Sequence, residues 1–417
     1  MTTLEGTPLT APPATRLPAF LHTRIGGLPR PFWVLWTGSL INRLGTMVEP
    51  FMAFYLVGVR GLSVPATGAV MAMFGAGSVF SQVIGGALAD RIGRRPTLTL
   101  GTLASAAAMV ALGYVSSLPA LIAVVFALGL TVDMYRPAAQ ALVADLVPAA
   151  DRTRAYGLLF WAVNLGFAAA MVAGGTLAGA GFHWLFWIDA LTFVVFGLLV
   201  WRAVPETRAA RPPGGDPGGF GDVLRDRVMV AFAALALVYH FVYLQAFTTL
   251  PLAIKVDGLP PAAYGTAMAL NGIVIIVVQP LVGARLGRLD HSRVLAAGTL
   301  VVGLGFGLTA LAAASALGYA ATVLVWTLGE IVVAAVSGAV VAALAPAHLR
   351  GRYSGLYGTS WSVGGLLAPA GGTWLLSAGA PALWLTCAGL CAAAACGQLL
   401  LAPAVRRRGA PASVPDP

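Results

Sequence analysis

The stretch that decides the fold is residues 85–98, GGALADRIGRRPTL, which lies between two long apolar runs. Gly86 allows the end of the first run to pack closely, and Gly93 permits a tight reversal of the chain. Asp90 is an acidic residue at the end of a predicted helix. Three basic residues would hold the turn at the lipid headgroups: Arg91, Arg94 and Arg95. This pattern is typical of a turn between two membrane helices.

The composition also points to lipid as the solvent. The chain has 417 residues, of which 59% are hydrophobic and 10% are charged. A soluble domain carries roughly 25% charged residues, and a single soluble core stops growing near about 250–300 residues. Apolar runs of about 20 residues recur along almost the whole length. The 51 glycines and 27 prolines suit membrane helices that pack closely and bend.

The net charge of +10 and the three cysteines each suggest a function that other features argue against. Basic residues form short clusters between apolar runs, and a basic face with interleaved aromatic residues is missing, so we expect no nucleic-acid partner. Cys387 and Cys391 stand four residues apart in the last apolar run, before Cys396. A metal pair is one interpretation, but no histidine or carboxylate shares that run. We expect apolar packing, no metal and no cofactor.

Twelve apolar runs predict an all-α membrane protein with twelve transmembrane helices. The runs cover residues 32–58, 66–88, 97–116, 119–145, 155–179, 183–202, 228–252, 262–285, 294–315, 318–345, 353–376 and 381–403. Residues 1–31 lack an apolar core of the signal-peptide type, so we predict a retained cytoplasmic arm. The polar, Pro/Gly-rich segment 203–227 predicts a cytoplasmic linker. It separates two six-helix bundles, 32–202 and 228–403, and a cytoplasmic tail follows at 404–417.

The basic residues orient the predicted helices. If the amino terminus is cytoplasmic, the cytoplasmic segments hold 21 Lys and Arg residues, and the outer loops hold only Arg60 and Lys255. Positive charge collects in the cytoplasmic loops of membrane proteins. We therefore predict a multi-pass protein of the cell inner (plasma) membrane with both termini cytoplasmic.

The second half repeats the first at a shift of 197–198 residues. Asp133 falls on Glu330, and residues 152–158 fall on 350–356. Helices rich in Ala, Gly and Leu would align in part anyway, but charges are few and these charges match. A six-helix repeat relates the halves by an axis along the membrane normal, and transporters of this build bind substrate between the halves near the midplane.

The turn at 85–98 strongly resembles the signature loop of the major facilitator superfamily, Gly-x-Leu-Ala-Asp-Arg-x-Gly-Arg-Arg. The twelve helices, the repeat and the central linker fit the same family, so the resemblance covers essentially the whole chain. It implies two pseudo-symmetric six-helix bundles. It also implies that Asp90 and its arginines form a conformational latch with neighbouring helix ends, for which Asp145 and Arg154 are the natural partners. An orientation signal alone would require the arginines but not Asp90 or the glycines.

Within the superfamily, residues 133–140 resemble the arginine-bearing motif of the twelve-helix, proton-coupled drug exporters, the drug:H+ antiporters. Asp133, Tyr135, Arg136 and Gln140 carry this resemblance. The antiporter motif Gly-Pro-x-x-Gly-Gly in the fifth helix is degraded, because residues 170–175 read AMVAGG. That departure weakens the antiporter assignment and leaves the family assignment unchanged.

Ionisable residues inside the predicted helices are the candidate functional residues, since one charge at the bilayer centre costs about 2.5–3.5 kcal/mol. They are Arg43, Glu49, Asp133, Arg136, His240 and Glu330. Asp133, His240 and Glu330 lie near mid-bilayer, on helices that the family resemblance places around a central cavity. Asp133, Arg136 and Gln140 would share one stripe of a continuous fourth helix.

Each of these charges also has a structural interpretation. Asp133 and Arg136 could form an in-helix salt bridge that only neutralises both. Glu330 has no cation one turn away, so it could be a carboxyl group kept protonated by desolvation, which is also the condition that a proton carrier needs. His240 could satisfy a backbone carbonyl, and Glu49 could be solvated near the outer surface.

Aromatic and amide residues near these charges could contact a ligand, or they could be packing residues and interfacial anchors. The candidates are Asn42, Tyr135, Trp161, Asn164, Tyr239, Tyr243, Gln245 and Trp361. Asn42 stacks on Glu49 along the first helix, and Tyr243 shares a face of the seventh helix with His240.

The sequence contains no Walker-type phosphate loop, so we expect that ATP does not drive transport directly. We predict a secondary active transporter, not an enzyme, that works by alternating access and exports lipophilic or amphipathic molecules in exchange for protons. Glu330 and Asp133 are the leading proton carriers. The expected partners are a small-molecule substrate, protons and the lipid bilayer, and the expected state is a monomer.

Two alternatives stay open. A proton-coupled uptake carrier for a metabolite would have the same fold, and the direction of labelled-substrate flux would distinguish it. A membrane enzyme or sensor acting on lipids would require a Ser/His/Asp cluster or a metal-ligand set at one interface. The five scattered histidines supply neither.

Overall fold

The computed structural model describes residues 27–148, 151–206, 220–312, 314–346 and 349–409. Within these ranges the chain forms helices and no β-strand. The side chains of Asp90 and Arg136 and the surroundings of Gly86 lie outside the described residues. The all-helical architecture confirms the fold class predicted from the sequence.

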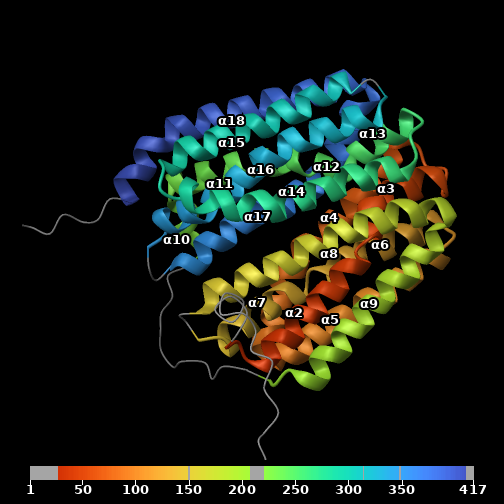
Figure 1. Cartoon of the computed structure of the whole chain (residues 1–417), viewed down its shortest axis with the longest axis horizontal. Coiled ribbons are helices and arrows are strands. Elements are labelled where there is room, and N and C mark those ends of the chain that lie inside the picture. Colours follow the sequence, from red (N-terminus) through yellow and green to blue (C-terminus); the bar gives the residue numbers. More distant parts are fainter. Residues whose placement is uncertain (1–26, 149–150, 207–219, 313, 347–348, 410–417) are drawn as a thin grey trace, which may run out of the picture.

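The first half of the molecule makes six passes, which occupy the red to yellow-green part of Figure 1. Its helices are α2 (Arg30–Gly45), α3 (Val48–Gly58), α4 (Val64–Ile92), α5 (Arg94–Tyr114), α6 (Leu118–Val132), α7 (Tyr135–Leu146), α8 (Arg152–Ala180) and α9 (Phe182–Ala203). The pairs α2–α3 and α6–α7 each form one interrupted pass.

The second half makes the other six passes, green to blue in Figure 1, after the short helix α10 (Phe220–Arg225). Its helices are α11 (Arg227–Tyr243), α12 (Gln245–Thr248), α13 (Leu250–Val256), α14 (Pro261–Leu286), α15 (His291–Leu308), the 3-10 turn η2 (Thr309–Leu311), α16 (Ala316–Leu344), α17 (Arg350–Ser377) and α18 (Ala380–Gly409). Helices α11 to α13 together form one interrupted pass.

Nine of the twelve passes in the described ranges are long and apolar enough to cross a membrane by composition alone. The other three have local reasons for a weaker apolar signal. Two are interrupted, at α2–α3 and α6–α7, and the third, α17, is rich in Gly, Ser and Thr. The predicted helix α18 is longer than expected, because it continues past residue 403 to Gly409.

The first, fourth and seventh passes are broken, although the sequence analysis expected a continuous helix in each. A proline lies in the first turn of α3, α7 and α13: Pro50, Pro137 and Pro251. Proline has no N–H, and its ring clashes with the carbonyl of residue i−4. A straight helix through these positions would therefore lose a hydrogen bond and gain a clash.

Side chains satisfy backbone groups that the breaks release, as a lipid environment requires. Asp189 on α9 accepts the backbone N–H of Val48 at 3.3 Å and so caps the start of α3. In the seventh pass, the amide nitrogen of Gln245 donates to the carbonyl oxygens of Phe241 and Ala368 at 3.0 and 3.2 Å. The break in the first pass is thus capped by a residue 141 positions away in sequence, whereas Gln245 lies at the break in the seventh pass and binds it to α17.

The two ends of the molecule carry different loops. Arg30, where α2 begins, and Gly409, where α18 ends, lie at one end with α10 and the α4–α5 turn, and we call this the basic end. The opposite end contains the loops that follow α3 and α13, which lie side by side in Figure 1. Of the predicted linker 203–227, residues 207–219 lie outside the described part of the chain.

The halves meet along two helix pairs, α4 with α17 and α8 with α14, and glycines let the backbones touch. A side-chain carbon at Gly75 would stand 2.2 Å from the carbonyl oxygen of Gly365. One at Gly265 would stand 2.3 Å from the carbonyl oxygen of Met171. We call these glycine contacts the seam. They lie between the opposite end and mid-membrane, so the halves are closed on that side.

Gly75→Ala is expected to shift the protein away from the form that is closed at the opposite end. The added methyl group overlaps the Gly365 carbonyl, and overpacking of this kind costs about 1–3 kcal/mol. The shift is measured as the distance between spin labels at Val59 and Val256, two exposed residues on different halves at the opposite end.

Gly389→Ala is the matched control for this substitution, because no atom lies within 4 Å of the carbon that it adds. Exposed Cys396 is replaced by serine in all variants, while the buried thiols of Cys387 and Cys391 stay in place. A label distance in Gly75→Ala that equals that of Gly389→Ala would contradict the closing role of the seam.

Candidate functional site

A cavity of about 360 Å³ lies between the two halves. Both halves supply its polar lining: Arg43, Thr46, Glu49, Ser78, Asp133 and Asn164 from the first, and Tyr243, Thr248, Asn271, Glu330 and Ser362 from the second. Charged groups inside the membrane characteristically face such cavities and mark the paths of substrates or ions. The cavity is therefore the candidate site.

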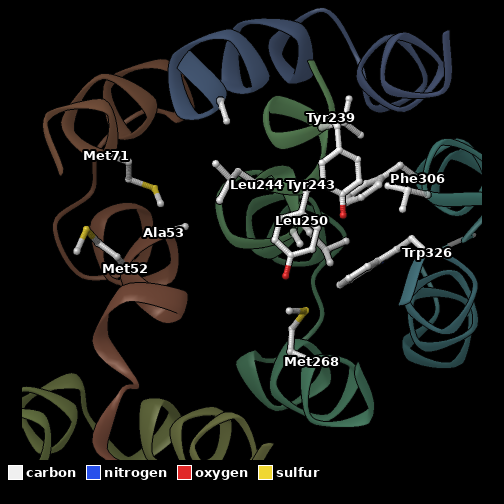
Figure 2. Close-up of a cluster of buried hydrophobic side chains, with 14 of the residues drawn as sticks. Met52, Ala53, Met71, Tyr239, Tyr243, Leu244, Leu250, Met268, Phe306 and Trp326 are labelled. Carbon is white, nitrogen blue, oxygen red and sulfur yellow. The ribbon is translucent and has the colours of Figure 1, made fainter. Parts of the chain in front are cut away.

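Aromatic rings and flexible thioethers form much of the remaining lining. These residues are Met52, Met71, Phe74, Phe160, Phe167, Phe247 and Trp361. Figure 2 shows Met52 and Met71 of the first half across from Tyr243, the last residue of α11, and Leu244, which follows it. Methionine side chains adapt to irregular apolar shapes, so this wall can accommodate ligands of varied outline.

Both carboxylate oxygens of Glu330 on α16 accept hydrogen bonds from other helices. The Tyr243 hydroxyl of α11 donates to Oε1 at 2.8 Å, and Asn271 Nδ2 of α14 donates to Oε2 at 2.8 Å. The same Asn271 nitrogen donates to Thr327 Oγ1 at 2.9 Å. Glu330 therefore ties three helices of the second half together at the cavity wall.

Asp133 lies where the fourth pass breaks, as the residue that directly follows α6. The Ser78 hydroxyl of α4 donates to Asp133 Oδ2 at 3.1 Å. The expected continuous fourth helix is interrupted between Val132, where α6 ends, and Tyr135, where α7 begins, and the shared stripe of Asp133, Arg136 and Gln140 stays a prediction. Since the Arg136 side chain lies outside the described residues, its predicted ion pair with Asp133 stays a prediction.

The break in the first pass also opens onto the cavity. Arg43 and Glu49, on either side of the break, line the cavity wall, which is not the exposed outer position considered for Glu49. Asn42 is buried, and the Tyr135 hydroxyl donates to its Oδ1 at 3.4 Å. Asn42 and Tyr135 are absent from the described cavity lining, and they join α2 to α7 instead.

His240 and Tyr239 lie behind the cavity wall. His240 Nδ1 is 2.9 Å from Ser360 Oγ on α17, and its ring contacts the ring of Trp361 with centroids 5.3 Å apart. Tyr239 stacks on Tyr243 with centroids 6.0 Å apart. Both side chains are buried, so they support the residues that face the cavity without being part of its described lining.

The remaining candidates divide between the cavity and its surroundings. Asn164 and Trp361 line the cavity, and Asn164 Nδ2 also donates to the carbonyl of Phe160 on its own helix at 2.9 Å. Gln245 is fully buried at the break in the seventh pass. Trp161 on α8 is 49% exposed and does not appear in the described lining.

Several polar residues of the cavity were missed by the sequence analysis. Asn271 carried a usable signal, because it is an amide in the middle of the apolar run 262–285. Ser78 and Thr248 carried none, since a hydroxyl in a helix readily bonds to the carbonyl four residues earlier, as Thr248 does with Leu244.

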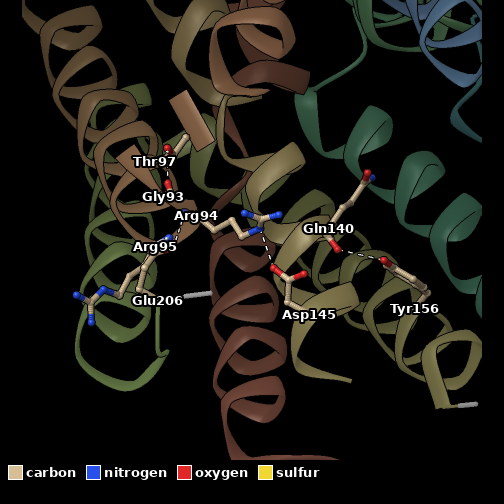
Figure 3. Close-up of polar contacts among 8 residues, drawn as sticks. All are labelled: Gly93, Arg94, Arg95, Thr97, Gln140, Asp145, Tyr156 and Glu206. Carbon is tan, nitrogen blue, oxygen red and sulfur yellow. Dashed lines mark hydrogen bonds and ion pairs between the residues drawn. The ribbon is translucent and has the colours of Figure 1, made fainter. Parts of the chain in front are cut away.

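The α4–α5 turn at the basic end is held by carboxylates from other elements (Figure 3). Gly93 has φ +105°, which favours glycine. Arg94 Nε lies 2.8 Å from Asp145 Oδ2 near the end of α7. The Glu206 carboxylate accepts the backbone N–H groups of Arg94 and Arg95 at 2.9 and 3.1 Å and so caps α5. Glu206 was not predicted from the sequence, because it lies more than a hundred residues further along the chain.

The other predicted latch residues are placed as follows. Arg154 NH2 lies 3.3 Å from Asp151 Oδ1, within the same helical turn. Arg91 is exposed at the end of α4. Because Gly86 and the Asp90 side chain lie outside the described residues, the predicted link from Asp90 to Arg154 stays a prediction.

A second carboxylate cluster holds the basic end of the second half. Asp226 Oδ1 accepts the backbone N–H groups of Val228 and Met229 at 3.0 and 3.2 Å, which caps α11. Asp226 Oδ2 accepts the Tyr353 hydroxyl at 2.7 Å and pairs with Arg408 at the end of α18. This cluster fixes the start of the second half to its last helix.

Asp290 repeats this arrangement at the start of α15. It accepts the backbone N–H of Arg293 at 2.9 Å and pairs with Arg406 of α18 at 2.9 Å. The hydrogen bond from the Arg293 backbone lowers the pKa of Asp290, burial opposes this effect, and Arg406 adds to the lowering.

The described part of the chain contains no group of three or more His, Cys, Asp or Glu side chains that could hold a metal ion. Cys391 packs against α15, where a side-chain carbon at Gly303 would stand 2.4 Å from its Cβ. Its neighbour Cys387 is also buried.

Two six-helix halves that enclose a cavity with charged and apolar walls are the architecture of a membrane transporter. Comparison with protein families agrees with this class, because the model described as the Major Facilitator Superfamily matches residues 35–369 and 258–416. The chain belongs to the major facilitator superfamily.

Curated relatives and solved structures resemble the chain over most of its length. The Multidrug resistance protein MdtH of Cronobacter sakazakii is 29% identical over 350 residues, which cover 82% of this chain and 86% of MdtH. The Na(+), Li(+), K(+)/H(+) antiporter of Planococcus maritimus is 23% identical, covering 78% and 84%. A structure of the peptide transporter POT with sulfate aligns with TM-score 0.79 at 18% identity, covering 92% and 96%, and therefore shares the fold.

Tyr243→Phe is expected to lower the thermal unfolding midpoint, because it removes the hydroxyl that donates to Glu330. A hydrogen bond to a charged group contributes about 1.5–3 kcal/mol, so the measurement is made near about pH 9, where a carboxyl group is ionised. Tyr264→Phe is the matched control, since that hydroxyl donates to the neutral carbonyl of Ala246 at 3.1 Å and should cost about 0.5–1.5 kcal/mol. Equal losses would argue against a charged acceptor.

Asp226→Asn is expected to flatten the dependence of thermal stability on acidic pH. Burial raises the pKa of Asp226, but hydrogen bonds from Arg408 and Tyr353 outweigh it and leave the pKa below its ordinary value. The carboxylate therefore stabilises the folded protein above the unfolded pKa of about 3.9, and this stabilisation is lost as the pH falls through the lower folded-state pKa. Unfolding midpoints measured downward from about pH 5 test this. An identical slope in both proteins would contradict it.

Proposed function

We propose that the protein exports lipophilic or amphipathic small molecules by alternating access, in exchange for protons. The observation that carries this proposal is the mixed lining of the cavity, where Glu49, Asp133 and Glu330 share one space with aromatic and methionine side chains. Such a lining fits a ligand with an apolar body and a polar end. The carboxyl groups supply the chemistry for proton exchange.

Glu330 and Asp133 are the proton carriers in this proposal. Each is bonded to a helix other than its own, Glu330 to α11 and α14, and Asp133 to α4 through Ser78. A charge-assisted hydrogen bond is roughly twice as strong as a neutral one. Gain or loss of a proton therefore changes how firmly these helices are held around the cavity.

Alternating access requires a second form in which the seam opens and the basic end closes. The α4–α5 turn, with Arg94 beside Asp145, serves as the latch that steadies one of the two forms. We propose a monomer in the cell inner (plasma) membrane with both termini cytoplasmic, because 21 basic residues lie on that side and two on the other. In this orientation the described form is closed to the outside.

The relatives favour export over uptake. MdtH carries the name of a multidrug resistance protein, and the relative from Planococcus maritimus is named as a cation/H+ antiporter. Drug resistance is a result that export of drugs would produce, and the second name describes exchange for protons. The peptide transporters among the solved structures bear on the fold alone.

The proposal is tested in proteoliposomes with an imposed pH gradient and ethidium as the amphipathic probe. Glu330→Gln keeps the shape of the side chain but cannot exchange a proton. We expect gradient-driven ethidium transport to fall by about tenfold or more, which corresponds to ~1.4 kcal/mol or more. Full transport by this variant would remove Glu330 from the coupling role.

Asp257→Asn is the matched control. Its carboxylate also accepts a tyrosine hydroxyl, that of Tyr319 at 2.7 Å, but it lies at the opposite end and outside the described cavity lining. This variant should keep the wild-type rate. Ethidium accumulation on the side from which protons leave distinguishes exchange from co-transport, and co-transport would contradict the export proposal.

A further inference from the structure

Two consecutive residues of α14 face the two partners of that helix. Asn271 Nδ2 contacts Glu330 and Thr327 on α16, at 2.8 and 2.9 Å. At the next residue, Gly272, a side-chain carbon would stand 3.0 Å from Ala168 Cβ on α8. Helix α14 therefore touches the candidate proton carrier with one residue and the other half of the molecule with the next.

The amide of Asn271 is held in one orientation. The Thr327 hydroxyl donates to the carbonyl of Val323 at 2.6 Å, so its oxygen is left to accept. Both neighbours of the amide nitrogen are thus acceptors, and an NH₂ group can satisfy both, whereas the amide oxygen can satisfy neither. Asn271 lines the cavity but is only 3% exposed, and these two bonds satisfy its amide nitrogen.

The two donors to Glu330 respond differently when the carboxyl group gains a proton. The Tyr243 hydroxyl can rotate and accept, because it has lone pairs. The Asn271 nitrogen has no acceptor capacity, so its bond changes from a charge-assisted one to a weaker neutral one or breaks. Protonation of Glu330 therefore weakens the hydrogen bond between α16 and α14 more than the one between α16 and α11.

We propose that Asn271 is the positioning residue that transmits the protonation state of Glu330 to the seam between the halves. This inference rests on the proposed function, because it takes Glu330 as a proton carrier. When Glu330 is ionised, Asn271 fixes α14 to α16 firmly. When Glu330 is protonated, α14 is held less firmly and can shift against α8, where Gly265 and Gly272 form part of the interface.

Other ionisable groups surround Glu330 at the cavity. Helix α11 presents Tyr243 and Tyr239, and across the cavity the first half presents Arg43, Glu49 and Asp133. From α17 the cavity receives Trp361 and Ser362, neither of which is ionisable near neutral pH. Helices α15 and α18 pack on α16 too, and Cys391 of α18 faces Tyr239.

The test measures the label distance between Val59 and Val256 from about pH 6 to about pH 9 in the full-length protein, with Cys396 replaced by serine. The wild type is expected to show a pH-dependent change in the population of forms closed at the opposite end. Asn271→Leu, which keeps the size and removes both hydrogen bonds, is expected to lose this change.

Gln398→Met is the matched control. Gln398 is a buried amide that accepts a threonine hydroxyl, that of Thr299 at 3.2 Å, away from the described cavity lining. It should keep the pH response. If Asn271→Leu does not give a monodisperse protein, Asn271→Ser, whose side chain is too short to reach Glu330, takes its place with the same expectation.

The outcomes separate this inference from the proposed function. Loss of the pH response in both Glu330→Gln and the Asn271 variant supports both. Loss in Glu330→Gln with a full response in the Asn271 variant overturns the transmitting role of Asn271 and leaves the carrier role of Glu330 intact. A full response in Glu330→Gln overturns the carrier role, and this inference falls with it.

Discussion

An ionisable group inside the hydrocarbon region is tolerated only where hydrogen-bond partners or a water-accessible cavity stabilise it. The rest of the structure depends on this constraint. Glu330 accepts hydrogen bonds from Tyr243 and Asn271, which lie on two other helices. Asp133 accepts a hydrogen bond from Ser78 of α4. The charges therefore determine which helices must be neighbours, and the cavity forms where these neighbours from both halves meet.

The backbone obeys the same constraint as the side chains. Three passes break next to prolines, and irregular backbone at membrane depth is tolerated only where protein or a cavity covers it. Asp189 covers the first break by capping α3, and Gln245 covers the third. Asp133 ends the helix before the second break and faces the cavity. The broken helices, the polar groups that cover the breaks and the cavity therefore follow from the same requirement, that no polar group faces lipid.

The sequence was sufficient for features that depend on local pattern. Apolar runs determined the twelve passes, because hydropathy over about 20 residues needs no knowledge of neighbours. Glu330 could be selected because an isolated acid in an apolar run is costly. The breaks were missed, since the effect of Pro50 or Pro137 depends on whether a distant residue such as Asp189 caps the new helix.

Other features could not be predicted because they depend on which helices touch. The hydrogen bond of Asn271 to Glu330 can be recognised only once α14 and α16 are known to be adjacent. The seam uses a few of 51 glycines, and nothing local distinguishes Gly75 from a glycine with open space around it, such as Gly389. Glu206 caps a helix that begins more than a hundred residues earlier. Contacts of this kind are properties of the assembled fold.

The last helix of the chain is fixed at the point where it leaves the membrane. Helix α18 continues to Gly409, and Arg406 and Arg408 bind it to the capping residues Asp290 and Asp226. Because these ion pairs fix the last turn of α18, a helical segment joined to it without a break would keep the same direction. A rigid helical fusion at Gly409 would hold a soluble marker domain at a constant angle, and electron microscopy would gain an alignment landmark for a protein that is mostly embedded in lipid.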